Sequence, residues 1–211
     1  MAIEITAFNW VPPFAQGYVK DVRIRWALEE AGLPYAVRLI DHEEKLTAAY
    51  RRRQPFSQVP VYRDDEVELF ETGAILIHLA GKSEALAPGD AAGRARASAW
   101  VLAALNSIEP HAQNLIHMGE AAEGVLRPQM AAMLNARLKG LSDWLGDAEY
   151  LEGRFTVGDL MMTTVLRELI DGGALAPFPN LEAYVARGMA RPAFGRALEA
   201  QLQVFREHAP A

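Results

Sequence analysis

The chain contains no cysteine. Disulfides, thiolate metal sites, iron–sulfur clusters and cysteine nucleophiles are therefore excluded, and a thiol can take part in chemistry here only if it arrives on a substrate. Long apolar runs are missing too: no segment has about 18 uncharged apolar residues, so no membrane span is expected. The N-terminal residues Met1–Ile5 lack the basic stretch followed by an apolar one that marks a signal peptide. We therefore expect a soluble, cytoplasmic protein.

Basic residues are fewer than acidic ones, which gives a net charge of -6. Arg51–Arg53 is the only basic cluster, and three arginines are more often a solvated face than a site for a polyanion. Non-specific binding of nucleic acid is therefore not expected. The 211 residues suffice for one large domain or two small ones, and 51% of them are hydrophobic, so a sizeable buried core is expected.

The first 80 residues alternate between strand and helix patterns. Apolar residues recur at every second position in Ile3–Ala7, and at spacings of three and four from about Val19 until Gly32 and Pro34 end the pattern. A strand, a helix and a second strand make a βαβ unit, for which parallel pairing is the default. The second strand is expected at 35–40, followed by a weakly helical stretch at 42–53, a hairpin of strands at 58–62 and around 67–69, and a helix from Glu71 to about Ala80.

Strand patterns stop after the first third of the chain. Residues 83–93 combine Pro, Gly, Ser and Asp and predict a linker. Thr156 with Asp159 indicates a helix start of the capping-box type. Helices are expected at 94–117, 125–146, 157–171 and 180–188, with a last one from about Ala193. The predicted organisation is an α/β domain at 1–82, a linker at 83–93 and an all-helical domain at 94–211.

Five short motifs follow one another over nearly the whole chain: Trp26–Gly32, Gln54–Val61, Glu71–Ile75, Phe155–Asp159 and Arg191–Phe194. In this order and at these spacings, the set resembles the cytosolic glutathione transferase (GST) superfamily, in a bacterial class that does not use cysteine. The resemblance implies a thioredoxin-like α/β N-terminal domain, an all-α C-terminal domain and a homodimer. It also implies glutathione as co-substrate.

The same resemblance implies an enzyme that conjugates the glutathione thiolate to a small apolar electrophile, as in detoxification. Cysteine-type classes, which carry out disulfide exchange and reduction instead, are ruled out by the composition. Two alternatives stay open. One is a non-catalytic glutathione-binding or regulatory module on the same fold, and the other is a glutathione-dependent peroxidase, isomerase or dehalogenase.

Pro60 lies inside an apparent strand, where proline is normally excluded unless it stands at an edge or a special turn. A cis Val59–Pro60 bond and a position at the start of an edge strand would each resolve this conflict. The resemblance implies the cis form, with the main chain of Val59 turned toward the cysteinyl part of glutathione. The tripeptide would then pair with the backbone like an added strand.

Thr72 is expected to be a helix N-cap, with free amides and a helix dipole that together favour an anion. The resemblance implies that this helix start holds the γ-glutamyl carboxylate, and that Glu71 faces the γ-glutamyl ammonium. Lys45 and Gln58 match positions that hold the glycyl carboxylate in several classes. For Lys45, an exposed surface lysine fits the sequence equally well.

The group that activates the thiol is harder to assign. A thiol of pKa about 8.5 is mostly protonated at neutral pH. The superfamily lowers that pKa with a hydrogen-bond donor, usually a Tyr or Ser in the loop after the first strand or at the start of the next helix. Residues 9–20 contain no serine, and counting back from Trp26 places Tyr18 near the serine position. Tyr18 is therefore the candidate catalytic residue, with a packed structural tyrosine as the alternative. Other donors in the loop are Gln16, the amide of Gly17 and the indole of Trp10.

A second pocket, for the electrophile, is expected to have an aromatic wall at Trp10 and Phe14, with helix residues near Leu115 and Met118. A core or dimer contact for the two aromatics is the alternative. His111 lies on the first long helix of the second domain, and its role stays open between approach to the sulfur and a purely structural place. The histidines show no metal-ligand spacing, so we expect no metal.

Overall fold

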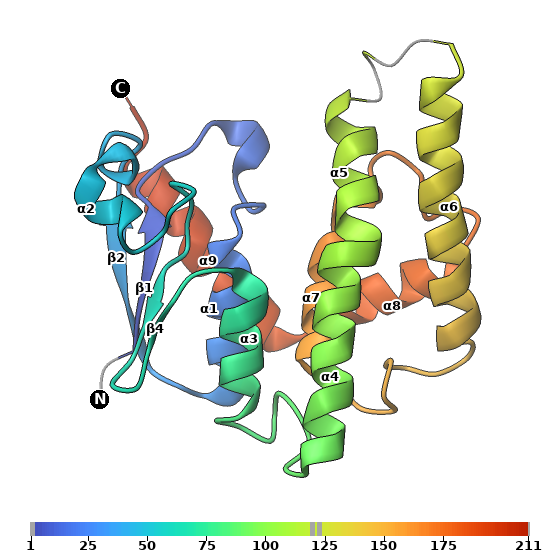
Figure 1. Ribbon diagram of the computed structural model, residues 1–211, viewed down its shortest axis with the longest axis horizontal. Coiled ribbons are helices and arrows are strands. Elements are labelled where there is room, and N and C mark those ends of the chain that lie inside the picture. The colour runs from blue at the N-terminus through green and yellow to red at the C-terminus, as the bar shows by residue number, and fades with distance from the viewer. Residues whose placement is uncertain (1–2, 119–120, 122–123, 211) are drawn as a thin grey trace. The chain divides into compact units, whose positions relative to one another are not determined.

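A computed structural model of the chain describes residues 3–118, 121 and 124–210. Contacts divide the chain into two compact units, Met1–Leu86 with Arg191–Ala211, and Ala87–Ala190. The outer limits of the two predicted domains, residues 1 and 211, lie outside the described residues. Figure 1 shows the order of the elements along the chain.

The first unit contains a four-stranded sheet and the helices that pack on it. Its elements are β1 (Ile3–Phe8), α1 (Asp21–Ala31), β2 (Tyr35–Ile40), α2 (Ala48–Arg51), β3 (Tyr62–Arg63), β4 (Glu68–Leu69), α3 (Thr72–Ala80) and α9 (Pro192–Glu207), with short 3₁₀ helices at Pro13–Ala15 and Glu44–Leu46. The strand order is β2-β1-β3-β4. β1 and β2 pair in parallel, from Ile3 opposite Tyr35 to Phe8 opposite Ile40, which confirms the predicted βαβ unit. β3 is antiparallel to β1 and β4 is antiparallel to β3, so the predicted hairpin is also confirmed.

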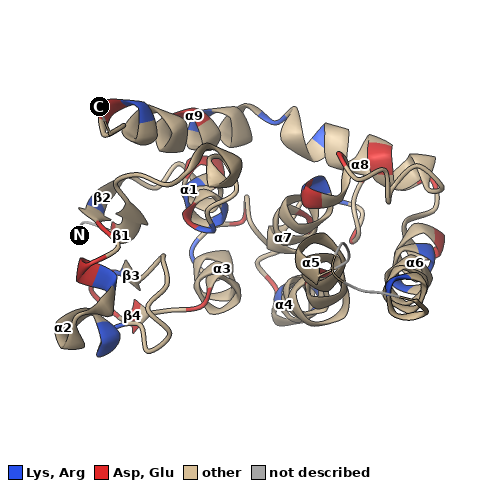
Figure 2. Ribbon diagram, turned by 90° about the horizontal axis from the view of Figure 1, so that it is seen from above, with Lys and Arg blue, Asp and Glu red and all other residues tan. Residues whose placement is uncertain are grey.

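α1 and α3 lie side by side on one face of this sheet, as Figure 2 shows, and the arrangement is thioredoxin-like. Apolar side chains of β1, α1 and α3 are fully buried in this unit, among them Ile5, Trp26 and Ile75. α1 ends where the sequence predicts, because Gly32 takes a left-handed conformation with φ of 64° and its amide closes the last turn.

The predicted strand at 58–62 is only partly correct, because regular pairing starts at Tyr62. Pro60 has no N–H to give to a ladder. The next amide, Val61 N–H, donates to the side-chain hydroxyl of Thr6 at 2.7 Å rather than to a neighbouring main chain. The Val61 carbonyl still accepts the main-chain amide of Thr6 at 2.8 Å, so a side chain replaces only the amide half of the expected ladder at Val61. This segment is part of the site described below.

The last helix, α9, belongs to the first unit by its contacts, whereas the sequence boundary places it in the helical domain. The edge of one ring meets the face of the other in the pair Trp26 and Phe194, with centroids 4.9 Å apart. Arg191 Nε lies 2.6 Å from Glu30 Oε1 at one end of this contact. The amphipathic stripe of α9 finds its partner surface on α1, about 170 residues earlier in the chain, and this is why local patterns misplace it.

The described part of the second unit is helical. Its elements are α4 (Ala91–Ala103), α5 (Glu109–Met118), α6 (Leu126–Leu145), α7 (Val157–Leu166) and α8 (Pro179–Met189), with a π-helical turn at Ala104–Ile108 and a 3₁₀ turn at Arg167–Leu169. α4 begins before the predicted residue 94, because Asp90 Oδ1 accepts the amide of Gly93 at 2.8 Å and caps the helix. The π-helical turn separates α4 from α5 within the helix predicted at 94–117.

α7 is the buried helix of the second unit: all 10 of its residues are buried, and it packs against α4 and α8. The predicted capping box is confirmed. Thr156 Oγ1 accepts the amide of Gly158 at 3.1 Å, and Asp159 Oδ2 accepts the amide of Thr156 at 2.9 Å. Among the described helices, none has the length and apolar character that a membrane crossing requires.

Candidate functional site

The Val59–Pro60 bond is cis, as the resemblance implies. Both residues are buried, and Val59 keeps only 8% of its surface exposed. Its side chain belongs to a cluster with Ile40, Tyr50 and Val61, called here the Val59 cluster, against which Phe8 and Val19 also pack. The main chain at Val59 therefore sits on apolar contacts from β2, α2 and the ends of β1 and the following loop.

A chain of hydrogen bonds braces the main chain on both sides of Val59–Pro60. Val61 N–H donates to Thr6 Oγ1 at 2.7 Å, and Tyr50 Oη donates to the carbonyl of Gln58 at 2.8 Å. The two hydroxyls lie 3.0 Å apart. Since Tyr50 has one hydroxyl proton and gives it to Gln58, the Thr6 hydroxyl is the donor between them. Burial raises the pKa of Tyr50, so the phenol keeps the proton that this chain needs.

Sequence reasoning missed Thr6 and Tyr50. Thr6 alternates with apolar residues in β1, and the strand period assigns it to the polar face, yet it is fully buried. Tyr50 lies in a stretch that sequence patterns describe only as polar and weakly helical. The residues next to Thr6 in the sequence do not reveal that its hydroxyl is buried and hydrogen-bonded, because its partners Tyr50 and Val61 lie 44 and 55 residues away in the chain.

The start of α3 differs in detail from the prediction. Glu71 occupies the N-cap position and Thr72 is the first helical residue, so the prediction that Thr72 is the N-cap is wrong by one position. Glu71 has φ of 69°, a conformation that is strained for a residue with a Cβ and is often found at functional sites. The side chain of Glu71 makes no capping hydrogen bond to this helix start within the described part of the chain. Its first amides therefore stay available to an anion, and the helix dipole favours one there.

The loop between β1 and α1 carries the predicted thiol-side residues. Trp10 is half-buried, whereas Phe14 is 84% exposed on the 3₁₀ turn. Gln16 Nε2 donates to the carbonyl of Val11 at 3.0 Å, so this side-chain amide already makes a hydrogen bond within the loop. Gly17 is buried with φ of 83°, a conformation that suits glycine. Tyr18 follows in the last turn before α1, with its side chain 40% exposed.

Lys45 lies close to Phe8, which packs against the Val59 cluster. Its Nζ lies 5.4 Å from the centre of the Phe8 ring, a cation–π distance. The imidazole of His42 stacks on the same ring, with centroids 4.7 Å apart. His42 was not predicted as a site residue, because a lone histidine in a polar stretch gives no signal. Gln58, the residue before Val59, is exposed.

The residues predicted in the second unit have separate surroundings. Leu115 lines a cavity of about 420 Å³ formed by α5, α6 and residues 172–177. Met118 is 57% exposed at the end of α5, and His111 is half-buried on the same helix. These contacts leave the roles of Leu115, Met118 and His111 as sequence predictions.

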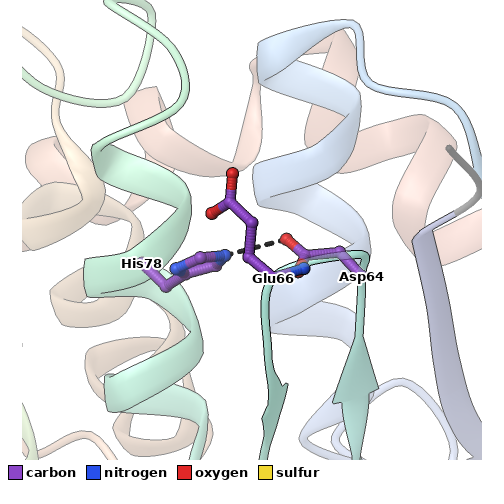
Figure 3. Close-up of side chains that lie close together, drawn as sticks. All are labelled: Asp64, Glu66 and His78. Atoms are coloured by element: carbon purple, nitrogen blue, oxygen red, sulfur yellow. Dashed lines mark hydrogen bonds and ion pairs between the residues drawn. The ribbon is translucent and has the colours of Figure 1, made fainter.

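A second polar cluster lies where the β3–β4 hairpin meets α3. The potential ligand atoms of Asp64, Glu66 and His78 lie within 4.8 Å of one another, close enough to share a metal ion. Figure 3 shows His78 of α3 pointing toward Asp64 of the hairpin, where Nε2 and Oδ2 are 2.9 Å apart. Lys82 Nζ already lies 3.1 Å from Asp64 Oδ2 and 3.0 Å from Glu66 Oε2. A protein ammonium thus provides the cation, and the cluster joins the hairpin to the helix.

Asp64 is the acceptor on which this cluster depends. Burial by itself would raise the pKa of its carboxyl, but hydrogen bonds from His78, Tyr62 and the amides of Val67 and Glu66 outweigh burial and hold the pKa well below its usual range. Tyr62 Oη donates to Asp64 Oδ2 at 2.7 Å. Burial and this carboxylate together raise the pKa of the Tyr62 phenol.

Comparison with known proteins identifies the first unit. Residues 5–81 match the family model for the glutathione S-transferase N-terminal domain. A glutathione S-transferase of Hyoscyamus muticus is 28% identical over 165 residues, which cover 69% of this chain and 76% of that protein. The disulfide-bond oxidoreductase YfcG of Escherichia coli K12 is 27% identical over 204 residues, which cover 85% of this chain and 91% of that protein.

Solved structures resemble nearly the whole chain. A glutathione transferase from Burkholderia graminis, crystallised with two glutathione molecules bound per subunit, superposes with a TM-score of 0.80 at 28% identity. The superposition covers 94% of this chain and 88% of that one. The likeness therefore includes the α/β and the helical parts.

The low pKa of Asp64 gives a testable dependence of stability on pH. Its folded pKa lies below the unfolded value of about 3.9, so its contribution to the free energy of unfolding is complete above about pH 5 and is lost as the pH falls through the folded pKa. We expect Asp64→Asn to lower the free energy of unfolding at pH 7 by about 2 kcal/mol. Urea denaturation between pH 7 and pH 3 should show this difference shrinking below about pH 4. The control Asp147→Asn, at an exposed aspartate, should show little difference at any pH. A loss with Asp64→Asn that does not change with pH would contradict this account.

Proposed function

The chain belongs to the cytosolic glutathione transferase superfamily, and from this premise we propose that it binds glutathione on its first unit and transfers the thiolate to a small apolar electrophile. The observation that carries the proposal is the braced main chain at Val59–Pro60, held by hydrogen bonds at Gln58 on one side and Val61 on the other. A peptide ligand can pair with such a fixed backbone edge at low cost in entropy. We place this activity in the cytoplasm.

Each part of glutathione has a group of matching chemistry in the first unit. The γ-glutamyl carboxylate is assigned to the uncapped amides at the start of α3, and the ammonium to the carboxylate of Glu71. The cysteinyl main chain is assigned to Val59. The glycyl carboxylate is assigned to Lys45 and Gln58, with His42 as a further donor on the same Phe8 ring.

We assign thiol activation to Tyr18. Gln16 is a weaker candidate, because its Nε2 already donates to Val11 within the loop. The Tyr18 side chain is 40% exposed, so a ligand can reach its hydroxyl without opening the core. A phenol that donates to the sulfur stabilises the thiolate and lowers the thiol pKa. Trp10 and Phe14 are assigned to the wall of the electrophile pocket.

A second candidate function is disulfide reduction with glutathione as the only source of thiols. One relative is a disulfide-bond oxidoreductase, and one similar structure holds two glutathione molecules per subunit. The first thiolate would attack a substrate disulfide, forming a mixed disulfide and releasing one substrate thiolate, which takes up a proton. The second glutathione thiolate would then attack the glutathione sulfur of that mixed disulfide, releasing the other substrate thiol and glutathione disulfide. No protein cysteine takes part, so the composition does not oppose this chemistry.

We also propose a homodimer. Two apolar features are open to solvent and suit burial between copies. Phe56 is 65% exposed and meets the edge of Phe70 at 6.2 Å. In the second unit, Trp100 and Trp144 line a cavity of about 210 Å³, and Trp144 is 62% exposed. Exposed aromatic side chains that lie next to one another are more common at interaction surfaces than on the rest of a protein surface.

For binding, we expect Glu71→Gln to raise the Kd for glutathione about tenfold, because a charge-assisted hydrogen bond is lost. Glutamine has a Cβ, as glutamate does, so the backbone strain at residue 71 is the same in the wild-type protein and in the variant. The control Glu182→Gln removes the same charge from an exposed site on α8 and should not change the Kd. Calorimetry should also be run with an analogue that lacks the γ-glutamyl amine. If Glu71 faces the ammonium, the variant loses affinity for glutathione but not for the analogue. Equal losses for both ligands would contradict this role.

For catalysis, we expect Tyr18→Phe to leave the Kd for glutathione unchanged and to lower kcat/KM with a model haloarene by about tenfold or more at pH 7. The reason is that the thiol pKa returns toward its free value. Gln16→Leu tests the other side-chain donor in the loop, and Tyr35→Phe, the same loss of a phenol hydroxyl at a residue with no role in the proposed site, is the matched control and should keep the wild-type kcat/KM. Unchanged activity in Tyr18→Phe would exclude Tyr18 as the activating residue. If the wild-type protein turns over small disulfides with glutathione but no electrophile, the second candidate function replaces transfer.

For assembly, light scattering should give a dimer for the wild-type protein at micromolar concentration. We expect Phe56→Ser to shift it toward monomer, because the variant removes an aromatic side chain from the interface. Phe14→Ser is the matched control, since Phe14 is even more exposed but lies in the proposed substrate pocket. It should leave the dimer intact. A monomeric wild-type protein would refute the homodimer.

A further inference from the structure

The helix α9 carries a glutamine, Gln201, that is 1% exposed. Its Nε2 donates to the carbonyl of Val19 at 3.1 Å and to Asp21 Oδ1 at 2.6 Å. Its Oε1, also buried, accepts no hydrogen bond from the described residues. A buried oxygen without a donor is unfavourable, and an apolar side chain at this position would avoid that cost. The two hydrogen bonds that Nε2 makes are what this glutamine adds over simple packing.

The two acceptors stand where the loop after β1 passes into α1. Asp21 is the first residue of α1 and is fully buried, and its Oδ2 accepts from Arg25 Nε at 2.7 Å. Gln201 and Arg25 thus hold one carboxylate from opposite helices. Val19 lies just before α1. Its carbonyl accepts a hydrogen bond from Gln201 of α9, and its side chain packs against the Val59 cluster. Val19 therefore connects α9 to the proposed glutathione site.

The same helix touches the loop at one more point. A Cβ added to Gly17 would lie 3.3 Å from Leu198 Cδ1, so Leu198 closes directly over the backbone of Gly17. α9 therefore contacts the loop at Gly17 and at Val19, the residues on either side of Tyr18. The Tyr18 side chain itself is 40% exposed, and the backbone on both sides of it is held by these two contacts.

We propose that Gln201 is a positioning residue for thiol activation: together with Leu198 it fixes residues 17–19 on α9 so that Tyr18 is held in place to donate to the glutathione sulfur. This inference rests on the proposed function. A hydrogen bond to a thiolate depends steeply on distance and angle, and a misplacement of about 1 Å can cost a large part of its effect. Gln201 does not touch glutathione in this scheme. It acts through the backbone of Val19 and the carboxylate of Asp21.

The test compares Gln201→Leu with Gln203→Leu, a matched control two residues further along α9 whose amide is exposed and bonds only to Glu207 among the described residues. The ultraviolet absorbance of the thiolate, followed against pH in the glutathione complex, reports the thiol pKa. We expect Gln201→Leu to raise this pKa by about one unit toward the free value of about 8.5, and to lower kcat/KM about tenfold at neutral pH. The Kd for glutathione should stay within about twofold, because the groups assigned to binding are untouched. The control should match the wild type in all three measurements.

A double-mutant cycle separates positioning from a general structural role. If Gln201 acts through Tyr18, then Gln201→Leu adds no further change in the thiol pKa when Tyr18 is already phenylalanine. Additive shifts would overturn this route. A Gln201→Leu protein that is less stable but keeps the wild-type thiol pKa would overturn the proposal, as would a weaker Kd with an unchanged pKa. If Gln201→Leu does not fold, Leu198→Ala, which loosens the contact over Gly17, should raise the thiol pKa in the same direction, and no shift would overturn the proposal.

The wild-type titration distinguishes the two levels of inference. A wild-type protein that binds glutathione without lowering its thiol pKa would overturn the proposed transfer and the role of Gln201 together. A wild-type protein that lowers the pKa, with a Gln201→Leu variant that lowers it equally, overturns the role of Gln201 alone.

Discussion

The hydrogen-bond chain from Val61 through Thr6 and Tyr50 to Gln58 is the constraint on which the proposed site depends. It adds to the single main-chain hydrogen bond from Thr6 N–H to the Val61 carbonyl, beside a proline that has no amide to donate. Because the groups come from β1, α2 and the segment before β3, the central strand and a peripheral helix both fix the same short stretch of main chain. A rigid backbone edge of this kind can receive a peptide without first being ordered.

The opposite side of the proposed site depends on a helix from the far end of the chain. α9 packs on α1, and its polar contacts reach the turn that precedes α1. This placement explains why α9 belongs to the first unit by its contacts. The loop after β1 has little regular structure of its own, so the surface beneath it decides how precisely its donors are held.

The absence of cysteine excludes less chemistry than the composition first indicates. It excludes chemistry by a protein thiolate, but a bound glutathione can supply that thiolate for transfer or for disulfide exchange. The relatives include proteins named for each activity. What separates the two is the number of thiols held at once and the group that activates them, which depends on the geometry of the loop.

The sequence by itself determined the order of the strands and helices, the capping box at Thr156 and the proline conflict at residue 60, because each rests on a period or a turn of a few residues. Only the tertiary structure decided which polar groups serve the site. The burial of Thr6, the stacking of His42 on Phe8 and the reach of Gln201 from α9 to the first helix depend on contacts between distant segments. The N-cap of α3 lies one residue before the predicted Thr72 for a related reason: Glu71 adopts a positive φ of 69°, which its residue type does not predict. Local patterns carry local geometry, whereas a binding site is assembled from separations of tens to hundreds of residues.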